Sequence, residues 1–161
     1  MEKIIVVCGP TATGKSDFAV ELARKVGGEI ISADSRQVYT GLDIGSGKIT
    51  KREMKDVPHY LLNVANPKRV FSVAQYKRLA DKTMKDILKR EKVPIICGGT
   101  GFYIDAVVYE QSLPEVKPNA KLRKELEKLS VAELGKKLQE FAAMESHILS
   151  ERYFLMILEL H

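Results

Sequence analysis

The segment over residues 9–16 constrains the fold of this chain more than any other, because it reads Gly-Pro-Thr-Ala-Thr-Gly-Lys-Ser. It follows a near-continuous apolar run over residues 3–8 and precedes an amphipathic stretch over residues 17–25, which stops at Gly27 and Gly28. This pattern predicts a strand buried on both faces, a glycine-rich turn and a helix in direct succession. In that context the backbone N–H groups of the turn and the positive end of the helix dipole face an anion. The sequence therefore predicts a phosphate-binding loop.

The residue types of this loop fit a diphosphate or triphosphate. Lys15 is expected to contact the terminal phosphate, and the Ser16 hydroxyl can coordinate Mg²⁺. An ordinary glycine-rich turn is the alternative, but the flanking strand and helix argue against it. The expected phosphate-binding residues are those of the whole loop: Gly9, Pro10, Thr11, Ala12, Thr13, Gly14, Lys15 and Ser16.

Composition places the chain among globular proteins of one domain, with at most a small appendage. It has 161 residues, of which 45% are hydrophobic and 29% are charged. The formal net charge of +5 gives a mild preference for a polyanionic partner. Cys8 and Cys97 both end apolar runs, which predicts buried, reduced thiols, no disulfide or zinc site, and a cytoplasmic location. No segment resembles a signal peptide or approaches membrane-spanning length.

Further apolar runs over residues 29–34, 58–64 and 94–97 are expected to be strands, and residues 72–90 and 102–109 are expected to be helices. Strands that alternate with helices predict an α/β fold, in which helices cover both faces of a mostly parallel sheet. Functional groups of such a sheet gather at the carboxyl ends of the strands. The phosphate-binding loop, Asp34 and Thr100 are therefore expected at the same edge.

The character of the sequence changes near residue 114, which predicts a core domain of residues 1–113 and a partial helical segment of residues 114–161. Residues 120–140 are rich in lysine and glutamate and are expected to form a helical stretch with a solvated face. Residues 153–158 are six consecutive apolar residues, and such a run favours self-association when it is exposed.

Four ordered motifs give the chain a family resemblance over residues 4–140. In addition to the phosphate-binding loop, they are Asp-Ser-Arg-Gln-Val-Tyr at 34–39, Gly-Leu-Asp-Ile-Gly at 41–45, Pro-His-Tyr-Leu at 58–61 and Gly-Gly-Thr-Gly-Phe-Tyr at 98–103. The chain closely resembles the tRNA dimethylallyltransferases, also called the tRNA isopentenyltransferase family. The resemblance implies a P-loop NTPase-like fold, shared with ATP-binding kinases. It also implies transfer of a dimethylallyl group from dimethylallyl diphosphate to the exocyclic amine of the adenosine 3′ of the anticodon.

The resemblance also implies roles for individual residues. Lys15 and Ser16 would hold the leaving diphosphate and its Mg²⁺ while negative charge accumulates. Asp34 would accept the proton of the adenine amine, although a helix N-cap or a group near Mg²⁺ is its alternative role. The target base must be flipped into the site. The implied catalytic residues are Asp34, Lys15 and Arg123, and the implied tRNA-binding residues are Asp34, Ser35, Arg36, Gln37, Thr100 and Arg123.

Some of these residues have plainer alternatives. Thr100 also suits a helix N-cap, Arg123 also suits a solvated helix surface, and His59 is expected to be a core histidine. The chain departs from the family at Tyr60 and Asn63, where a histidine and an aspartate are usual. If that aspartate organises the metal, Asn63 is expected to weaken the site.

Length and tail set this chain apart from the family. Family members are roughly twice as long, so the chain is expected to be a shortened member with a divergent tail, lacking helices and a further strand. The full-length family is expected to be monomeric, with the tRNA anticodon loop and dimethylallyl diphosphate as partners and no membrane contact.

Three other functions compete with tRNA prenylation. An adenylate isopentenyltransferase would prenylate a free nucleotide, and a non-catalytic remnant would only bind diphosphate. A small-molecule kinase shares the loop, but it would normally carry lid arginines, and none stands out in residues 98–116.

Overall fold

The computed structural model describes residues 3–109 and 119–144. The chain forms two compact units, Met1–Glu115 and Val116–His161. The predicted boundary between residues 113 and 114 lies outside the described residues. Within the described ranges, no helix combines the length and the apolar character that a membrane span requires.

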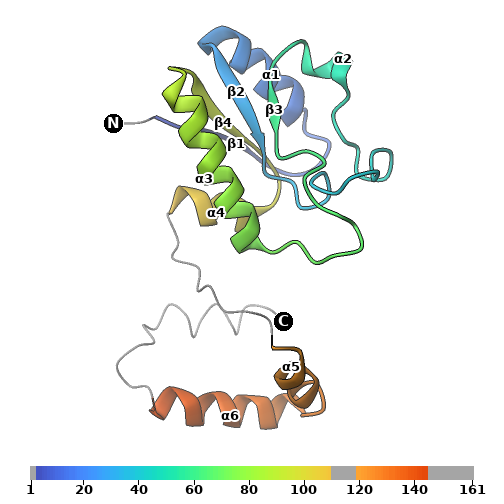
Figure 1. Ribbon diagram of the computed structural model, residues 1–161, viewed down its shortest axis with the longest axis vertical. Helices are drawn as coiled ribbons and strands as arrows, with labels where there is room; N and C mark the ends of the chain where they lie inside the picture. Colours follow the sequence, from blue (N-terminus) through green and yellow to red (C-terminus); the bar gives the residue numbers. More distant parts are fainter. Residues whose placement is uncertain (1–2, 110–118, 145–161) are drawn as a thin grey trace. The chain divides into compact units, whose positions relative to one another are not determined.

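The first unit is built on a four-stranded sheet in which every neighbouring pair is parallel, as predicted. The strands lie in the order β1-β4-β2-β3 (Figure 1). Their bounds are β1 (Ile5–Cys8), β2 (Gly28–Ser32), β3 (His59–Tyr60) and β4 (Val93–Gly98). The helices of this unit are α1 (Lys15–Val26), α2 (Lys51–Met54), α3 (Val73–Lys89) and α4 (Gly101–Val108).

An apolar layer lies on each face of this sheet, between the sheet and its helices. This confirms the prediction that helices cover both faces. Successive side chains of a strand point to opposite faces. Ile30 and Ile95 therefore pack with residues of α1, whereas Ile31 and Ile96 pack with residues of α3 and α4. All four are at most 2% exposed. Burying each of them contributes about 1.5–3 kcal/mol before the entropy cost of folding is counted.

The first strand differs from its prediction. It lies at an edge of the sheet, because β4 rather than β1 takes the position beside β2. Only Val7 of this strand is buried, and Cys8 is exposed. The expectation of two buried thiols is therefore right for Cys97 and wrong for Cys8. Both cysteines are free thiols.

The third strand is shorter than predicted. Pairing stops after Tyr60, because Leu61 and Asn63 have positive φ angles of 62° and 57°, which extended backbone does not allow. The long helix begins as predicted, since the Ser72 hydroxyl accepts the N–H of Gln75 and the Gln75 side chain accepts the N–H of Ser72.

The second unit contains α5 (Ala120–Leu126) and α6 (Val131–Met144). The helical stretch predicted over residues 120–140 is thus divided in two. The division falls at Ser130, whose hydroxyl accepts the N–H of Glu133 while the Glu133 carboxylate accepts the N–H of Ser130. This reciprocal capping starts a new helix. The apolar residues 153–158 lie outside the described residues.

Candidate active site

The predicted phosphate-binding loop joins β1 to α1 and has an irregular backbone. Gly9, Ala12 and Gly14 have positive φ angles of 151°, 63° and 78°. Glycine adopts such angles freely, whereas Ala12 is held in a region that L-residues rarely occupy. Alternating backbone handedness of this kind turns successive N–H groups toward one concavity, which is how proteins bind anions with backbone alone.

Lys15 lies at the junction of this loop with α1. Its ammonium group donates a hydrogen bond to the Pro10 carbonyl and lies 3.5 Å from the Thr13 hydroxyl. The Thr13 hydroxyl in turn donates to the Pro10 carbonyl over 2.9 Å. The Lys15 side chain therefore folds back toward the loop. This keeps the positive charge of the ammonium group beside the backbone N–H groups of the loop.

Asp34 follows β2 at the carboxyl edge of the sheet. Its Oδ1 accepts the N–H groups of Arg36 and Gln37 at 2.8 and 3.2 Å, so Asp34 caps the turn that it begins. This is the capping role that the sequence left open. Within the described residues, Oδ2 has no protein hydrogen-bond donor. One oxygen is thus structural, and the other remains available to accept a proton.

Thr100 joins the end of β4 to the segment that follows β2. Its hydroxyl accepts the Ser35 N–H at 2.9 Å, and its own N–H donates to the Ala33 carbonyl at 3.1 Å. Thr100 occupies the N-cap position of α4, but its side chain makes no capping bond there. The hydroxyl therefore holds the Asp34 segment in place.

Two glycines let the three motifs come together. A Cβ on Gly98 would lie 2.2 Å from the Ala33 carbonyl oxygen, and one on Gly99 would lie 3.3 Å from the Gly9 carbonyl oxygen. The first distance excludes any side chain, and the second is a tight contact. The β4–α4 turn thus contacts both the phosphate-binding loop and the end of β2.

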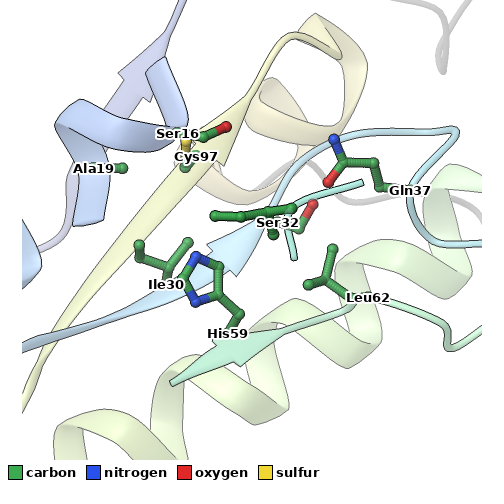
Figure 2. A pocket seen from close by; sticks show the side chains of 9 residues that line it. Ser16, Ala19, Ile30, Ser32, Gln37, His59, Leu62 and Cys97 are labelled. Carbon is green, nitrogen blue, oxygen red and sulfur yellow. The ribbon is translucent and has the colours of Figure 1, made fainter. Parts of the chain in front are cut away.

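A cavity opens beside this edge, between α1 and the sheet (Figure 2). It is small and partly open to solvent, with about 20 Å³ available to the centre of a water molecule. The residues that line it are Ser16, Ala19, Ile30, Ser32, Gln37, Ile49, His59, Leu62 and Cys97. A residue of the phosphate-binding loop and a predicted tRNA-binding residue therefore face the same space.

His59 is only partly buried and lines this cavity, so the expectation of a core histidine is met only in part. Its Nδ1 lies 2.8 Å from the Val57 carbonyl, which can only accept, so Nδ1 carries the proton. Burial lowers the pKa of His59 below its ordinary value. Burial therefore favours the neutral imidazole over the imidazolium.

The two departures from the family pattern have structural partners. The Tyr60 hydroxyl donates to Glu29 at 2.9 Å. The Asn63 amide oxygen accepts a hydrogen bond from Lys48, which also donates to Asp43. In the described part of the chain, no group of three or more His, Cys, Asp or Glu side chains is arranged to hold a metal ion.

The remaining predicted residues differ in their placement. The backbone of Arg36 is fixed by Asp34, while the residue itself is exposed. Gln37 is partly buried, and its amide donates to the Gly47 carbonyl at 3.3 Å. Arg123 is an exposed residue of α5, so it belongs to the second unit.

These features define a class. A parallel sheet with a glycine-rich, lysine-containing loop between its first strand and first helix is the arrangement of the P-loop α/β class. Within that class, the chain belongs to the IPP transferase family, whose sequence profile matches residues 37–151.

Curated relatives agree with this assignment. The chain is 46% identical over 139 residues to the tRNA dimethylallyltransferase of Anoxybacillus flavithermus, covering 86% of this chain and 45% of that protein. It is 46% identical over 128 residues to the protein of the same name from a Thermoanaerobacter species, covering 80% and 41%. The chain thus spans less than half the length of these relatives.

Solved structures show the same fold. The full-length tRNA isopentenylpyrophosphate transferase of Bacillus halodurans matches with a TM-score of 0.70 and 36% identity, over 99% of this chain and 54% of that one. A eukaryotic dimethylallyltransferase acting on tRNA matches with a TM-score of 0.69 and 30% identity, over 78% of this chain and 31% of that one.

Proposed function

We propose that this chain carries the catalytic core for transfer of a dimethylallyl group from dimethylallyl diphosphate to tRNA. The acceptor would be the exocyclic amine of the adenosine 3′ of the anticodon. One observation carries the proposal most directly. The phosphate-binding loop and the turn that Asp34 caps meet at one edge of the sheet, where Thr100 accepts the Ser35 N–H and Gly98 and Gly99 allow close approach of the backbone. The names of the relatives, which specify tRNA, favour tRNA over a free nucleotide as acceptor.

The loop would bind the diphosphate of the donor. Backbone N–H groups, the N-terminus of α1 and the Lys15 ammonium all offer positive charge to a leaving group that becomes more negative. Mg²⁺ fits this arrangement, because it is commonly held by one or two protein ligands together with substrate phosphates and water. Ser16 would be its protein ligand, and the ion would neutralise charge on the diphosphate.

Asp34 would serve as the general base. The C1–O bond of the donor breaks and its electron pair leaves with the diphosphate, while the adenine amine forms the new N–C1 bond. The amine must lose one proton, and Oδ2 of Asp34 can accept it while Oδ1 keeps its two backbone hydrogen bonds. The turn capped by Asp34 therefore holds the base in a fixed position.

The segment after Asp34 would contact the flipped adenosine and its neighbours. Ser35, Arg36 and Gln37 offer hydroxyl, guanidinium and amide groups, which suit base edges and phosphates of single-stranded RNA. Thr100 lies within hydrogen-bonding distance of the Ser35 backbone and would sit beside the same nucleotide. Arg123 would contribute a further tRNA contact from the second unit.

Incubation with labelled dimethylallyl diphosphate tests the proposal, with tRNA and AMP offered in parallel. Label that appears in tRNA and is lost in Lys15→Ala supports it. Label that appears in AMP instead identifies an adenylate isopentenyltransferase. Diphosphate binding without transfer to either acceptor identifies a binding module and refutes the proposed activity.

A further inference from the structure

Lys48 lies in the connection between β2 and α2, and its charged side chain is only 5% exposed. The ammonium group donates to the Tyr39 carbonyl at 2.7 Å, to the Asp43 carboxylate at 2.7 Å and to the Asn63 amide oxygen. A lysine ammonium has three N–H donors. These three acceptors therefore satisfy the hydrogen-bonding capacity of Lys48.

This hydrogen bonding separates Lys48 from a lysine that binds substrate. A phosphate-binding lysine needs N–H donors that can reach the ligand, whereas the donors of Lys48 are directed at protein acceptors. Lysine side chains are almost never buried unless they are paired, because the ammonium group loses its hydration. We therefore expect Lys48 to act on the segments that supply its acceptors.

The three acceptors come from two segments of the chain that lie side by side. Two of them belong to the connection between β2 and α2, whereas Asn63 belongs to the segment that follows β3 (Figure 1). Backbone hydrogen bonds also join residues 37–40 to residues 63–65. Lys48 thus adds a charged link between two segments that already pair through their backbones.

Gln37 makes hydrogen bonds with two residues of this cluster. Its side-chain amide donates to the carbonyl of Gly47, which directly precedes Lys48, at 3.3 Å. Its own carbonyl accepts the Asn63 N–H at 3.3 Å. The Gln37 N–H in turn donates to Oδ1 of Asp34 at 3.2 Å. Gln37 therefore connects the cluster around Lys48 with the turn that Asp34 caps.

We propose that Lys48 is a positioning residue for the acceptor side of the site, which it serves by holding Gln37 in place. The proposal rests on the proposed function, in which Gln37 contacts the flipped adenosine or its neighbours. A glutamine amide is planar and has two N–H donors and one acceptor oxygen. The hydrogen bond to Gly47 fixes one donor, so it also fixes the directions of the other donor and of the oxygen. Lys48 itself would contact neither tRNA nor the diphosphate.

Steady-state prenylation of tRNA by a Lys48→Met chain tests this role, because methionine keeps an apolar stem of similar length and removes the three donors. We expect kcat/KM for tRNA to fall by ~10–10²-fold, since a displacement of about 1 Å can cost this much. The KM for dimethylallyl diphosphate and the affinity for pyrophosphate with Mg²⁺ should not change. Lys85→Met is the matched control at an exposed position of α3 and should change none of these values.

Two further measurements separate positioning from other roles. A lysine that binds a tRNA phosphate adds about one unit to the slope of log affinity against log salt concentration, so Lys48→Met should leave that slope unchanged. In a double-mutant cycle, Lys48→Met should cost little more once Gln37→Ala is present, because the two residues act through one contact.

Three results would overturn the assignment while the native chain prenylates tRNA. An unchanged kcat/KM would show that Lys48 positions nothing that the reaction needs. A smaller salt slope would show a direct phosphate contact. An equal loss with and without Gln37→Ala would show that Lys48 does not act through Gln37.

Asp43→Asn provides a second variant if Lys48→Met does not fold, because the Asp43 side chain is 65% exposed. It should lower kcat/KM for tRNA by a smaller factor at an unchanged salt slope, and no loss would overturn the assignment. A native chain that transfers no label to tRNA refutes the proposed function itself, and the role of Lys48 fails with it.

Discussion

Replacing Glu29 with glutamine should destabilise the first unit, because Glu29 is the buried member of a charged cluster. The Glu29 side chain is 7% exposed. Its carboxylate accepts two N–H groups of Arg90, one of them at 2.8 Å, and the Tyr60 hydroxyl at 2.9 Å. Through Arg90, Glu29 and Tyr60, this cluster links the C-terminal end of α3 to β2 and β3.

The size of the effect follows from these contacts. A hydrogen bond to a charged group is worth about 1.5–3 kcal/mol. Glutamine keeps one acceptor oxygen but loses the charge and offers an N–H₂ group to the second guanidinium nitrogen. The Arg90 side chain is 40% exposed, so water can replace part of the hydrogen bonding that the guanidinium loses when Glu29 is replaced. We therefore expect Glu29→Gln to lower the free energy of unfolding by about 2 kcal/mol at pH 7.

The pH dependence gives this prediction its sharpest test. The hydrogen bond from Arg90 lowers the pKa of Glu29 below its ordinary value of 4.5. A lowered pKa in the folded state stabilises the fold above the unfolded pKa, and that stabilisation is lost as the pH falls through the folded value. The difference in the free energy of unfolding between the native and Glu29→Gln chains should thus be largest at pH 7. It should shrink below about pH 4.5.

Urea unfolding of the native chain, Glu29→Gln and Glu21→Gln at several pH values measures this difference. Glu21 is exposed on α1, so the same chemical change there should have little effect. A Glu29→Gln chain as stable as the native one at pH 7, or equally weakened at every pH, would refute the reasoning.

Three other substitutions test separate parts of the structure. Lys15→Ala should abolish pyrophosphate binding in calorimetry without changing the unfolding midpoint; unchanged affinity would remove the loop as the diphosphate site. Tyr76→Phe should stabilise the fold by ~1 kcal/mol in urea unfolding, because the buried Tyr76 hydroxyl has no hydrogen-bond partner in the described structure; a loss of stability would mean that the hydroxyl has one. Gly98→Ala should cost ~1–3 kcal/mol, because its Cβ would meet the Ala33 carbonyl, whereas Gly101→Ala has open space; equal effects would contradict the close approach.

The sequence predicted the sheet and the order of its elements well, because the signals were local. The glycine-rich loop fixes a strand before it and a helix after it, and Ser72 with Gln75 marks the start of α3. The prediction that functional groups gather at one edge follows from parallel topology alone. Asp34, Thr100 and the loop do meet there.

Other features depend on contacts between distant residues and left no local signal. The edge position of β1 is decided by which strand lies beside β2, and apolar runs look alike at edges and centres. The early end of β3 reflects positive φ angles at Leu61 and Asn63, two residue types that sequence patterns did not mark as breaks. The glycine pair at 98 and 99 was a partial signal, since adjacent glycines often allow close backbone approach.

Within the candidate site, the sequence marked the phosphate-binding loop, Asp34 and Thr100, but not the side chains packed around them. Lys48, whose side chain is 5% exposed, binds Asp43 and Asn63; the motifs drew attention to these two residues but not to Lys48. The apolar wall of the cavity comes from separate strands and a loop, so its members share no spacing along the chain. Such a wall can be seen only once the chain is folded.

The most direct test of the central claim compares single-turnover rates of the native chain and Asp34→Asn with saturating dimethylallyl diphosphate and tRNA. The claim is that the phosphate-binding loop and Asp34 form one site for prenyl transfer. Asparagine keeps an Oδ1 that can cap the turn, but it cannot accept the proton of the adenine amine. We predict that Asp34→Asn prenylates tRNA ~10²–10⁴-fold more slowly, with unchanged pyrophosphate affinity. Equal rates for the two chains would contradict the claim and leave Asp34 as a structural cap.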